Sequence, residues 1–316
     1  MDQPSAASLR ERLVLGADVR MALGAGRPVV TLESTLISHG LPYPQNVAVA
    51  RASEAAVRAS GATPATVAIR GGQLIVGLDD DALEALATAP AGSVLKAARP
   101  SLAAAFASGG WAATTVSATM IAAAAAGISV FATGGIGGVH RGAFGAGASL
   151  DVSSDLEELA RTPVAVMCAG PKAILDLPLT LEYLETRGVP VVALGQDEVP
   201  GFYSVSSGVA APHVAVDIAA AARIVATQLG LGLGAGILLC TPVPAAVALP
   251  LDEARAAIER ALADAAAAGI HGPATTPWLL ARIAELTDGA SVRANTALIE
   301  NDARVAGLLA VALAGS

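Results

Sequence analysis

Short apolar runs alternate with longer alanine-rich segments along most of this chain. Short runs bounded by glycine and proline are typical of buried strands, and longer segments with helical spacing of apolar residues are typical of helices. The pattern predicts strands over 28–32, 65–69, 128–133, 164–168, 189–194 and 236–239. It predicts helices over 46–60, 80–88, 115–126, 154–161, 173–187 and 217–229, and a wholly helical tail over 252–269 and 276–314. This alternation indicates an α/β fold with a mainly parallel central sheet.

Hydrophobic residues make up 54% of the 316 positions and charged residues only 15%, which raises the question of a membrane protein. The longest uncharged stretches, over 100–139 and 224–251, are rich in alanine, glycine, serine and threonine, and prolines interrupt the second. A membrane-spanning helix needs about 20 predominantly apolar residues in a run. The stretches therefore predict buried strands and helices. Because composition does not change along the chain, we expect a single domain over 1–316.

The amino terminus, the cysteines and the net charge indicate the cellular compartment and the type of binding partner. The amino terminus has no apolar segment like that of a signal peptide, and the two cysteines, Cys168 and Cys240, lie in apolar runs. They are interpreted as buried thiols in a reducing cytoplasm, so we expect a cytoplasmic protein. A net charge of −8 argues against a nucleic-acid surface, which requires clustered lysine and arginine. A small-molecule substrate fits better.

Polar residues gather where predicted strands end. The sequence E-S-T-L-I-S-H-G-L-P-Y-P-Q-N (33–46) follows the first strand, T-G-G-I-G-G-V-H-R-G (133–142) follows the third, and C-A-G-P-K (168–172) ends the fourth. In parallel sheets, ligands bind at the carboxyl ends of the strands. The three loops are therefore expected to meet at one site, with Lys172 just past a strand end and at the start of a helix.

Lysine usage singles out two residues. The chain has 17 arginines but only two lysines, Lys96 and Lys172. Arginine stays protonated and cannot act as an amine nucleophile, whereas lysine can form imines with carbonyl substrates. A helix start disfavours positive charge, which would make the Lys172 amine a better nucleophile. The alternative is that either lysine persists by chance.

Two further segments each have more than one interpretation. Glycines 134–138 could hold a phosphate with their amides, helped by His140 and Arg141, or could form a tight turn that needs positive φ. They are weak support for a dinucleotide site, because no acidic residue follows in the required setting. Asp151 and Asp155, with serines between them, could hold a hard cation or cap a helix, where Ser154 and Glu157 match a capping box.

The histidines and cysteines do not form a zinc-binding pattern, and no Ser-His-Asp set can be identified from spacing. His213 and His271 are interpreted as structural or surface residues.

Taken together, five segments resemble the pseudouridine-5'-phosphate glycosidase (pseudouridylate synthase) family. They are 32–46, 114–121 (T-T-V-S-A-T-M-I), 130–142, 160–172 (A-R-T-P-V-A-V-M-C-A-G-P-K) and 179–192, and a carboxy-terminal stretch at 294–299 (A-N-T-A-L-I) is also similar. The resemblance implies a three-layer α/β/α fold, a homotrimer and a divalent metal, usually Mn²⁺. It implies reversible cleavage of the carbon-carbon glycosidic bond of pseudouridine 5'-phosphate to uracil and ribose 5-phosphate.

The resemblance also implies roles for individual residues. Lys172 matches the nucleophile, Glu33 the proton donor, Asp151 the metal ligand and Asn295 an active-site amide. The expected substrate-binding residues are Lys96, Val116, Thr133, His140, Ser153, Ser154 and Asp155. A carbon-linked base cannot be released by protonating a ring nitrogen, so an imine between Lys172 and the ring-opened sugar offers a different route.

Two departures from the family pattern concern the base site and the loop before Asp151. Around Lys96 the chain reads K-A-A-R-P-S, which lacks polar groups that the family usually has, and the loop between Arg141 and Asp151 is longer. Base recognition could therefore differ. Two other functions remain open: a non-catalytic sugar-phosphate sensor, and an aldolase-like imine enzyme acting on another phosphorylated sugar.

Overall fold

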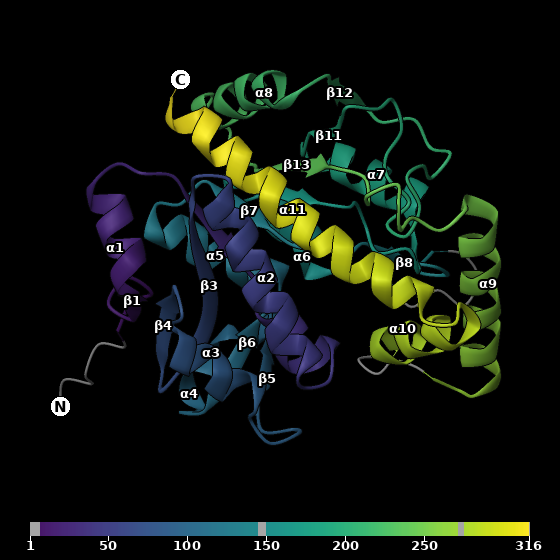
Figure 1. Ribbon diagram of the computed structural model, residues 1–316, viewed down its shortest axis with the longest axis horizontal. Coiled ribbons are helices and arrows are strands. Elements are labelled where there is room, and N and C mark those ends of the chain that lie inside the picture. The colour runs from purple at the N-terminus through teal and green to yellow at the C-terminus, as the bar shows by residue number, and fades with distance from the viewer. Residues whose placement is uncertain (1–6, 145–149, 271–274, 316) are drawn as a thin grey trace.

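The computed structural model describes residues 7–144, 150–270 and 275–315 (Figure 1). Its strands are β1 (Leu13–Leu15), β2 (Val29–Leu32), β3 (Thr63–Arg70), β4 (Gln73–Val76), β5 (Leu95–Ala97), β6 (Trp111–Thr114), β7 (Val130–Ala132), β8 (Val139–His140), β9 (Ala165–Cys168), β10 (Leu175–Asp176), β11 (Val191–Leu194), β12 (His213–Ala215) and β13 (Ile237–Cys240). Its α-helices are α1 (Ala17–Gly24), α2 (Gln45–Ala59), α3 (Asp80–Ala87), α4 (Leu102–Ala107), α5 (Val116–Ala126), α6 (Ser154–Leu159), α7 (Leu177–Thr186), α8 (Ile218–Gly230), α9 (Leu251–Ala267), α10 (Thr275–Leu286) and α11 (Ala290–Ala314).

One large sheet runs through the molecule in the order β1-β4-β3-β2-β7-β9-β13-β11-β12, with β6 joined to β3 and β5 joined to β6. Neighbouring strands from β3 through β2, β7, β9, β13, β11 and β12 are parallel, whereas β3 pairs antiparallel with β4 and with β6. The expected mainly parallel sheet is confirmed, and each predicted strand overlaps an observed one. The pattern missed β1, β4, β5, β6 and β12, which are short and lie toward the ends of the sheet.

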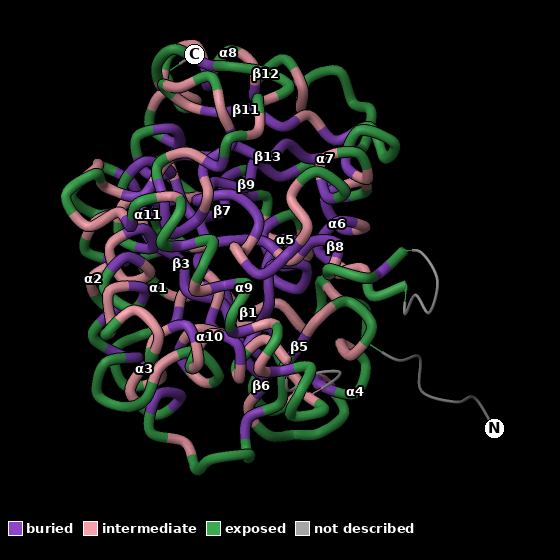
Figure 2. The backbone as a smooth tube through the Cα atoms, turned by 90° about the vertical axis from the view of Figure 1, so that its right-hand side faces the viewer, coloured by how far each residue is buried: buried purple, intermediate pink, exposed green. Residues whose placement is uncertain are grey.

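Helices cover both faces of this sheet. Side chains along a strand alternate between faces, so Val130 joins the apolar cluster of α2, α8 and α11, while Phe131 joins that of α1, α5, α6 and α7. Helix α11 lies alongside α2 across one face (Figure 1). The buried segments form the centre of the molecule in the turned view (Figure 2). The three-layer α/β/α arrangement is confirmed.

A third apolar cluster fixes the carboxyl-terminal helices. Helices α9 and α10 pack together and contribute Ile258 and Leu279 to a cluster that includes Leu298 of α11. Asp288 and Gly289 have φ angles of 47° and 74°, which end α10 and start α11. The prediction of an unbroken helix over 276–314 is wrong at this point, because left-handed backbone cannot continue an α-helix.

Among the described residues, no helix is both long enough and apolar enough to cross a membrane. The apolar composition is accounted for by the strands and by the alanine-rich helix faces that pack on them.

Candidate active site

A cavity of about 370 Å³ opens among the loops that follow the strands. Its lining includes most of the expected site residues: Glu33, Lys96, Val116, His140, Asp151, Ser153, Ser154, Asp155 and Lys172. Glu33 follows β2 and Lys172 follows β9, as expected for ligand sites at the carboxyl ends of parallel strands. The structure thus brings residues 139 positions apart, Glu33 and Lys172, into one cavity.

Glu33 is held by a hydrogen bond from a residue that follows β7, the strand paired with β2. The hydroxyl of Thr133, directly after β7, donates to Glu33 Oε1. Burial raises the pKa of Glu33, although the charge of Lys172 and the hydrogen bond from Thr133 act in the opposite direction. A carboxyl group with a raised pKa holds its proton more readily at neutral pH, which suits a proton donor. Thr133 lies behind Glu33 and does not line the cavity itself.

Both lysines of the chain face this cavity. Lys96 is the central residue of β5, which is joined to the rest of the sheet through β6. Partial removal from water lowers the pKa of Lys96, and the nearby charge of Lys172 lowers it further, while Glu33 and Asp155 act in the opposite direction. Two amines beside two carboxylates make a site that can bind an anion and also exchange protons.

The backbone around Lys172 is fixed by a neighbouring loop and not by a helix. The Lys172 amide donates to the Ile136 carbonyl (3.0 Å), and Pro171 forms an isolated parallel β-bridge with Ile136. Strand β10 comes next, and α7 begins only at Leu177, where Asp176 caps it by accepting from the Leu179 amide (3.0 Å). The prediction of a helix starting at 173 is therefore wrong, and the helix-start argument for activating Lys172 falls with it.

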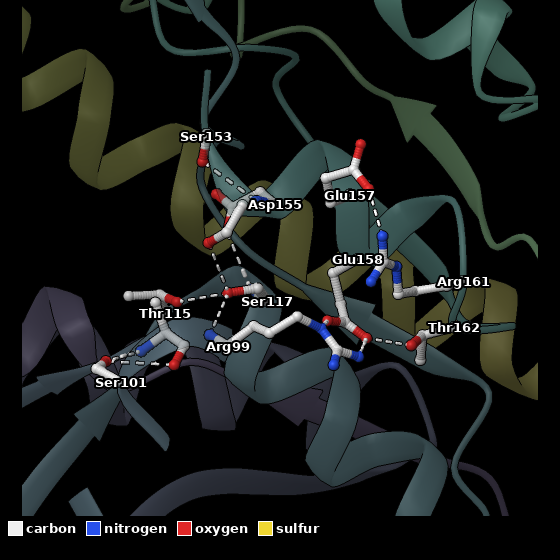
Figure 3. A network of polar contacts seen from close by, with 12 residues as sticks. Arg99, Ser101, Thr115, Ser117, Ser153, Asp155, Glu157, Glu158, Arg161 and Thr162 are labelled. Atoms are coloured by element: carbon white, nitrogen blue, oxygen red, sulfur yellow. Dashed lines mark hydrogen bonds and ion pairs between the residues drawn. The ribbon is translucent and has the colours of Figure 1, made fainter. Parts of the chain in front are cut away.

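Asp155, in the first turn of α6, connects that helix to the first turn of α5 and to the glycine-rich loop over 134–138. Its carboxylate accepts from the Ser117 amide (3.0 Å) and from the Gly137 amide (2.9 Å), and the residue is 5% exposed. The cap of α6 is Ser153, whose hydroxyl accepts from the Asp155 amide (3.2 Å), as Figure 3 shows. The cap expected at Ser154 is therefore wrong by one residue, since Ser153 is the residue that caps the helix.

Glu157, the other half of that expected box, points elsewhere. Its carboxylate pairs with Arg161 and Arg187 and accepts from the Tyr183 hydroxyl (2.7 Å).

Glycines 134–138 are explained by close packing. None of them has positive φ, so the tight-turn interpretation is wrong. A Cβ at Gly137 would lie 2.2 Å from the Ser153 hydroxyl oxygen, and one at Gly138 would lie 2.6 Å from that of Thr180. Only glycine allows this segment to lie against both neighbours. Since the Gly137 amide already donates to Asp155, it is not free to hold a phosphate.

His140 and Asp151 lie together at the edge of the cavity. His140 Nδ1 is 3.8 Å from Asp151 Oδ2, and the Asp151 side chain is 52% exposed. In the described part of the chain, no three His, Cys, Asp or Glu side chains are grouped as metal ligands. One exposed carboxylate therefore remains as a candidate ligand for a hard cation.

Several expected residues lie elsewhere. Arg141 lines a separate cavity of about 320 Å³ on the other side of Lys172. Asn295 on α11 is half-buried and is not among the cavity-lining residues. It precedes Ile299 by about one helical turn, and Ile299 contacts a small hollow beside Glu33 and Thr133.

The other histidines and the cysteines can also be compared with expectation. His213 is exposed on β12, which confirms a surface residue, and His271 lies outside the described residues. Cys168 and Cys240 are buried and unbridged, as the apolar runs predicted.

Some lining residues were not found from the sequence. Thr35 and Thr115 contribute to the cavity wall. Thr35 lies within the polar loop after β2, so its position was a usable signal. Thr115 follows β6, a strand that the pattern missed, so its place at a strand end could not be recognised. The contact between Arg99 and Glu158 behind the cavity also went unnoticed, because the two residues are 59 positions apart.

Comparisons with known proteins agree with this arrangement. The protein family described as "Indigoidine synthase A like protein" matches residues 18–312. The pseudouridine-5'-phosphate glycosidase of Paracoccus denitrificans is 54% identical over 305 residues, covering 96% of this chain and 98% of that protein. The chain belongs to the pseudouridine-5'-phosphate glycosidase family. Another family member, from Deinococcus radiodurans, is 53% identical and covers 98% of this chain and 97% of its own length.

Two solved structures resemble the fold closely. The prealnumycin C-glycosynthase AlnA in complex with ribulose 5-phosphate superimposes with a TM-score of 0.87 at 38% identity, covering 96% of this chain and 97% of the other. An indigoidine synthase A-like protein from Thermotoga maritima gives a TM-score of 0.85 at 30% identity, covering 99% of this chain and all of the other. The resemblance seen in the sequence motifs is therefore confirmed.

Proposed function

We propose that this protein is a pseudouridine-5'-phosphate glycosidase, which converts pseudouridine 5'-phosphate and water to uracil and ribose 5-phosphate. The observation that carries the proposal is the identity of 54% across 96% of the chain to a glycosidase of that name. The geometry supports it independently, because Glu33 and Lys172, the expected acid and nucleophile, line the same cavity.

In the proposed reaction, Glu33 donates a proton to the ring oxygen of the sugar while the bond from that oxygen to the anomeric carbon breaks. The Lys172 amine bonds to the anomeric carbon and gives a proton to Glu33. The carbon-carbon bond to the base then breaks as Glu33 passes that proton to the base carbon and the nitrogen lone pair forms the imine. The product is uracil and an imine between Lys172 and the open sugar. Water hydrolyses the imine, which releases ribose 5-phosphate and frees the amine.

Lys96 is proposed to hold the phosphate or to orient the base. Its amine is a compact charge, and Ser153 and Ser154 line the same cavity. We propose that these groups, with Val116 and His140, bind the substrate. The related glycosynthase AlnA holds a sugar phosphate, ribulose 5-phosphate, which supports a sugar-phosphate ligand for this cavity.

A divalent cation such as Mn²⁺ is proposed to bind Asp151. The half-exposed Asp151 carboxylate fits a hard cation that keeps several of its waters. Bound there, the cation would supply positive charge for substrate oxygens. We expect EDTA to abolish activity, Mn²⁺ to restore it, and Asp151→Asn to weaken Mn²⁺ binding measured by electron paramagnetic resonance.

Release of uracil tests the function directly. The protein is incubated with Mn²⁺ and pseudouridine 5'-phosphate, and free uracil is measured by chromatography. Uracil is the expected result. Folded protein that binds the substrate without releasing uracil would be a sensor. Protein that forms an imine with sugar phosphates but ignores pseudouridine 5'-phosphate would be an aldolase-like enzyme.

Trapping of the imine tests the role of Lys172. Borohydride with ribose 5-phosphate should attach the sugar to Lys172, found by peptide mass spectrometry, and Lys172→Arg should stay unlabelled despite keeping its charge. Label on Lys96 would exchange the roles assigned to Lys172 and Lys96.

Asn295 is proposed to act as an active-site amide. Asn295→Ala is therefore expected to lower the rate of uracil release.

We further propose that the whole chain forms one domain and that three copies assemble into a homotrimer. The assembly rests on the family resemblance. Light scattering in solution would give the mass of the assembly, and a monomer mass of 31.0 kDa at working concentration would contradict it.

A further inference from the structure

A buried carboxylate lies behind the candidate active site. Glu158 on α6 is fully buried, and its oxygens accept hydrogen bonds from two nitrogens of Arg99, one of them at 2.8 Å, and from the Thr162 hydroxyl. A carboxylate removed from water needs such donors, and a two-point contact with arginine fixes both partners in angle as well as distance. Figure 3 shows the Arg99 side chain reaching across to Glu158.

The two partners belong to two different segments that contribute to the cavity wall. Arg99 follows β5, and Lys96, the cavity-lining lysine of that strand, is three residues earlier. Glu158 is one helical turn after Asp155, which also lines the cavity. The contact therefore joins two segments that are far apart in sequence and that both face the substrate.

Hydrogen bonds between backbone and side-chain groups connect this contact to the cavity. The Arg99 amide donates to the Ser117 hydroxyl (3.2 Å), and the Ser117 amide donates to Asp155 (3.0 Å). The Ser101 hydroxyl donates to the Lys96 carbonyl (3.0 Å) and accepts from the Ala98 amide (2.9 Å). A shift of Arg99 would thus move the end of β5.

We propose that Arg99 and Glu158 are positioning residues, which fix the separation between Lys96 and Asp155 and so set how Lys96 meets the substrate. The inference rests on the proposed function. Neither side chain is among those that line the cavity, so their effect reaches the substrate only through Lys96, whose distance from Asp155 they fix.

The test compares Arg99→Lys with a matched control. Lysine keeps the charge but cannot make the two-point contact. We expect KM for pseudouridine 5'-phosphate to rise by about tenfold with kcat changed less than about twofold, the pattern for loss of binding that is equal in ground and transition states. Glu157→Gln is the control, because it breaks ion pairs on the same helix, with Arg161 and Arg187, that face away from the cavity.

Two further variants separate positioning from general stability. Glu158 is buried, whereas the Arg99 side chain is 41% exposed. Replacing buried charges by apolar residues is often neutral for stability, so the double variant R99L/E158L is expected to keep its melting temperature while its KM rises as in Arg99→Lys. In a Lys96→Ala background, Arg99→Lys should leave KM unchanged, because the contact acts through Lys96.

The outcomes are distinct. If wild-type protein releases uracil but Arg99→Lys and R99L/E158L have the KM of Glu157→Gln, the positioning role is overturned. It is also overturned if Arg99→Lys raises KM equally with and without Lys96. If wild-type protein releases no uracil, the proposed function fails. The same variants are then compared by calorimetric binding of ribose 5-phosphate. Weaker binding by Arg99→Lys than by wild type supports the positioning role, and equal binding overturns it.

Discussion

Asp302 offers a test of electrostatics in the interior. The residue lies on α11 and is fully buried, and neither of its carboxyl oxygens has a hydrogen-bond partner among the described residues. The nearby Ala169 amide donates instead to the Gly134 carbonyl (3.0 Å). Burial raises the pKa of Asp302 well above its ordinary value of 3.8, and Cys168 adds to the shift. Folded protein therefore keeps the Asp302 proton to a higher pH than unfolded protein does.

The magnitude follows from proton linkage. Unfolded protein loses the Asp302 proton as the pH rises above 3.8, whereas folded protein keeps it. In that range the folded state binds one more proton, so the free energy of unfolding falls by about 1.4 kcal/mol for each pH unit. The fall stops where the pH passes the pKa of folded Asp302. Below the unfolded pKa both states are protonated and the contribution is constant.

Asp302→Asn removes this titration while keeping the shape. The difference in unfolding free energy between wild type and variant should change by about 1.4 kcal/mol between about pH 5 and pH 6, with wild type losing stability relative to the variant. Urea denaturation followed by tryptophan fluorescence measures it. Asn301→Ser, which removes a hydrogen bond to the Pro242 carbonyl (3.2 Å) but nothing that titrates, should show no such slope. A difference independent of pH for Asp302→Asn would refute the reasoning.

Two other predictions concern the cavity. Thr133→Val removes the hydrogen bond that lowers the pKa of Glu33, so the pKa of Glu33 should rise further. The alkaline limb of the profile of kcat against pH should then move to higher pH. An unmoved limb would show that Glu33 is not the acid. Gly137→Ala would place its Cβ 2.2 Å from the Ser153 oxygen and should cost about 1–3 kcal/mol in unfolding free energy, measured by urea denaturation, whereas Gly110→Ala, with nothing within 4 Å, should cost little.

The sequence predicted the central sheet well because its strands are buried on both faces and read as continuous apolar runs. It failed at short strands such as β5 and β6, where a few residues pair at the side of the sheet and leave no clear period. It also placed a helix directly after Lys172, because nothing in the local pattern distinguishes the β10 residues from a helix start. Strand β10 forms because it pairs antiparallel with β8, which lies more than 30 residues earlier in the chain.

The candidate site was predictable where polar residues follow buried strands. Glu33, Thr133 and Lys172 each stand at such a point, so position alone brought them together. Asp155 was expected to contact substrate and lines the cavity. Its two hydrogen bonds from the Ser117 and Gly137 amides depend on three-dimensional packing. Side-chain pairs such as these have no signature in sequence spacing.

The placement of both lysines in one cavity has a practical consequence for spectroscopy. Protein grown with isotope-labelled lysine would give only two side-chain signals by nuclear magnetic resonance, and both would come from this cavity. Each signal would report its own amine during titration with pH, metal or sugar phosphate. A large enzyme would thus display its binding chemistry in a spectrum as simple as that of a dipeptide.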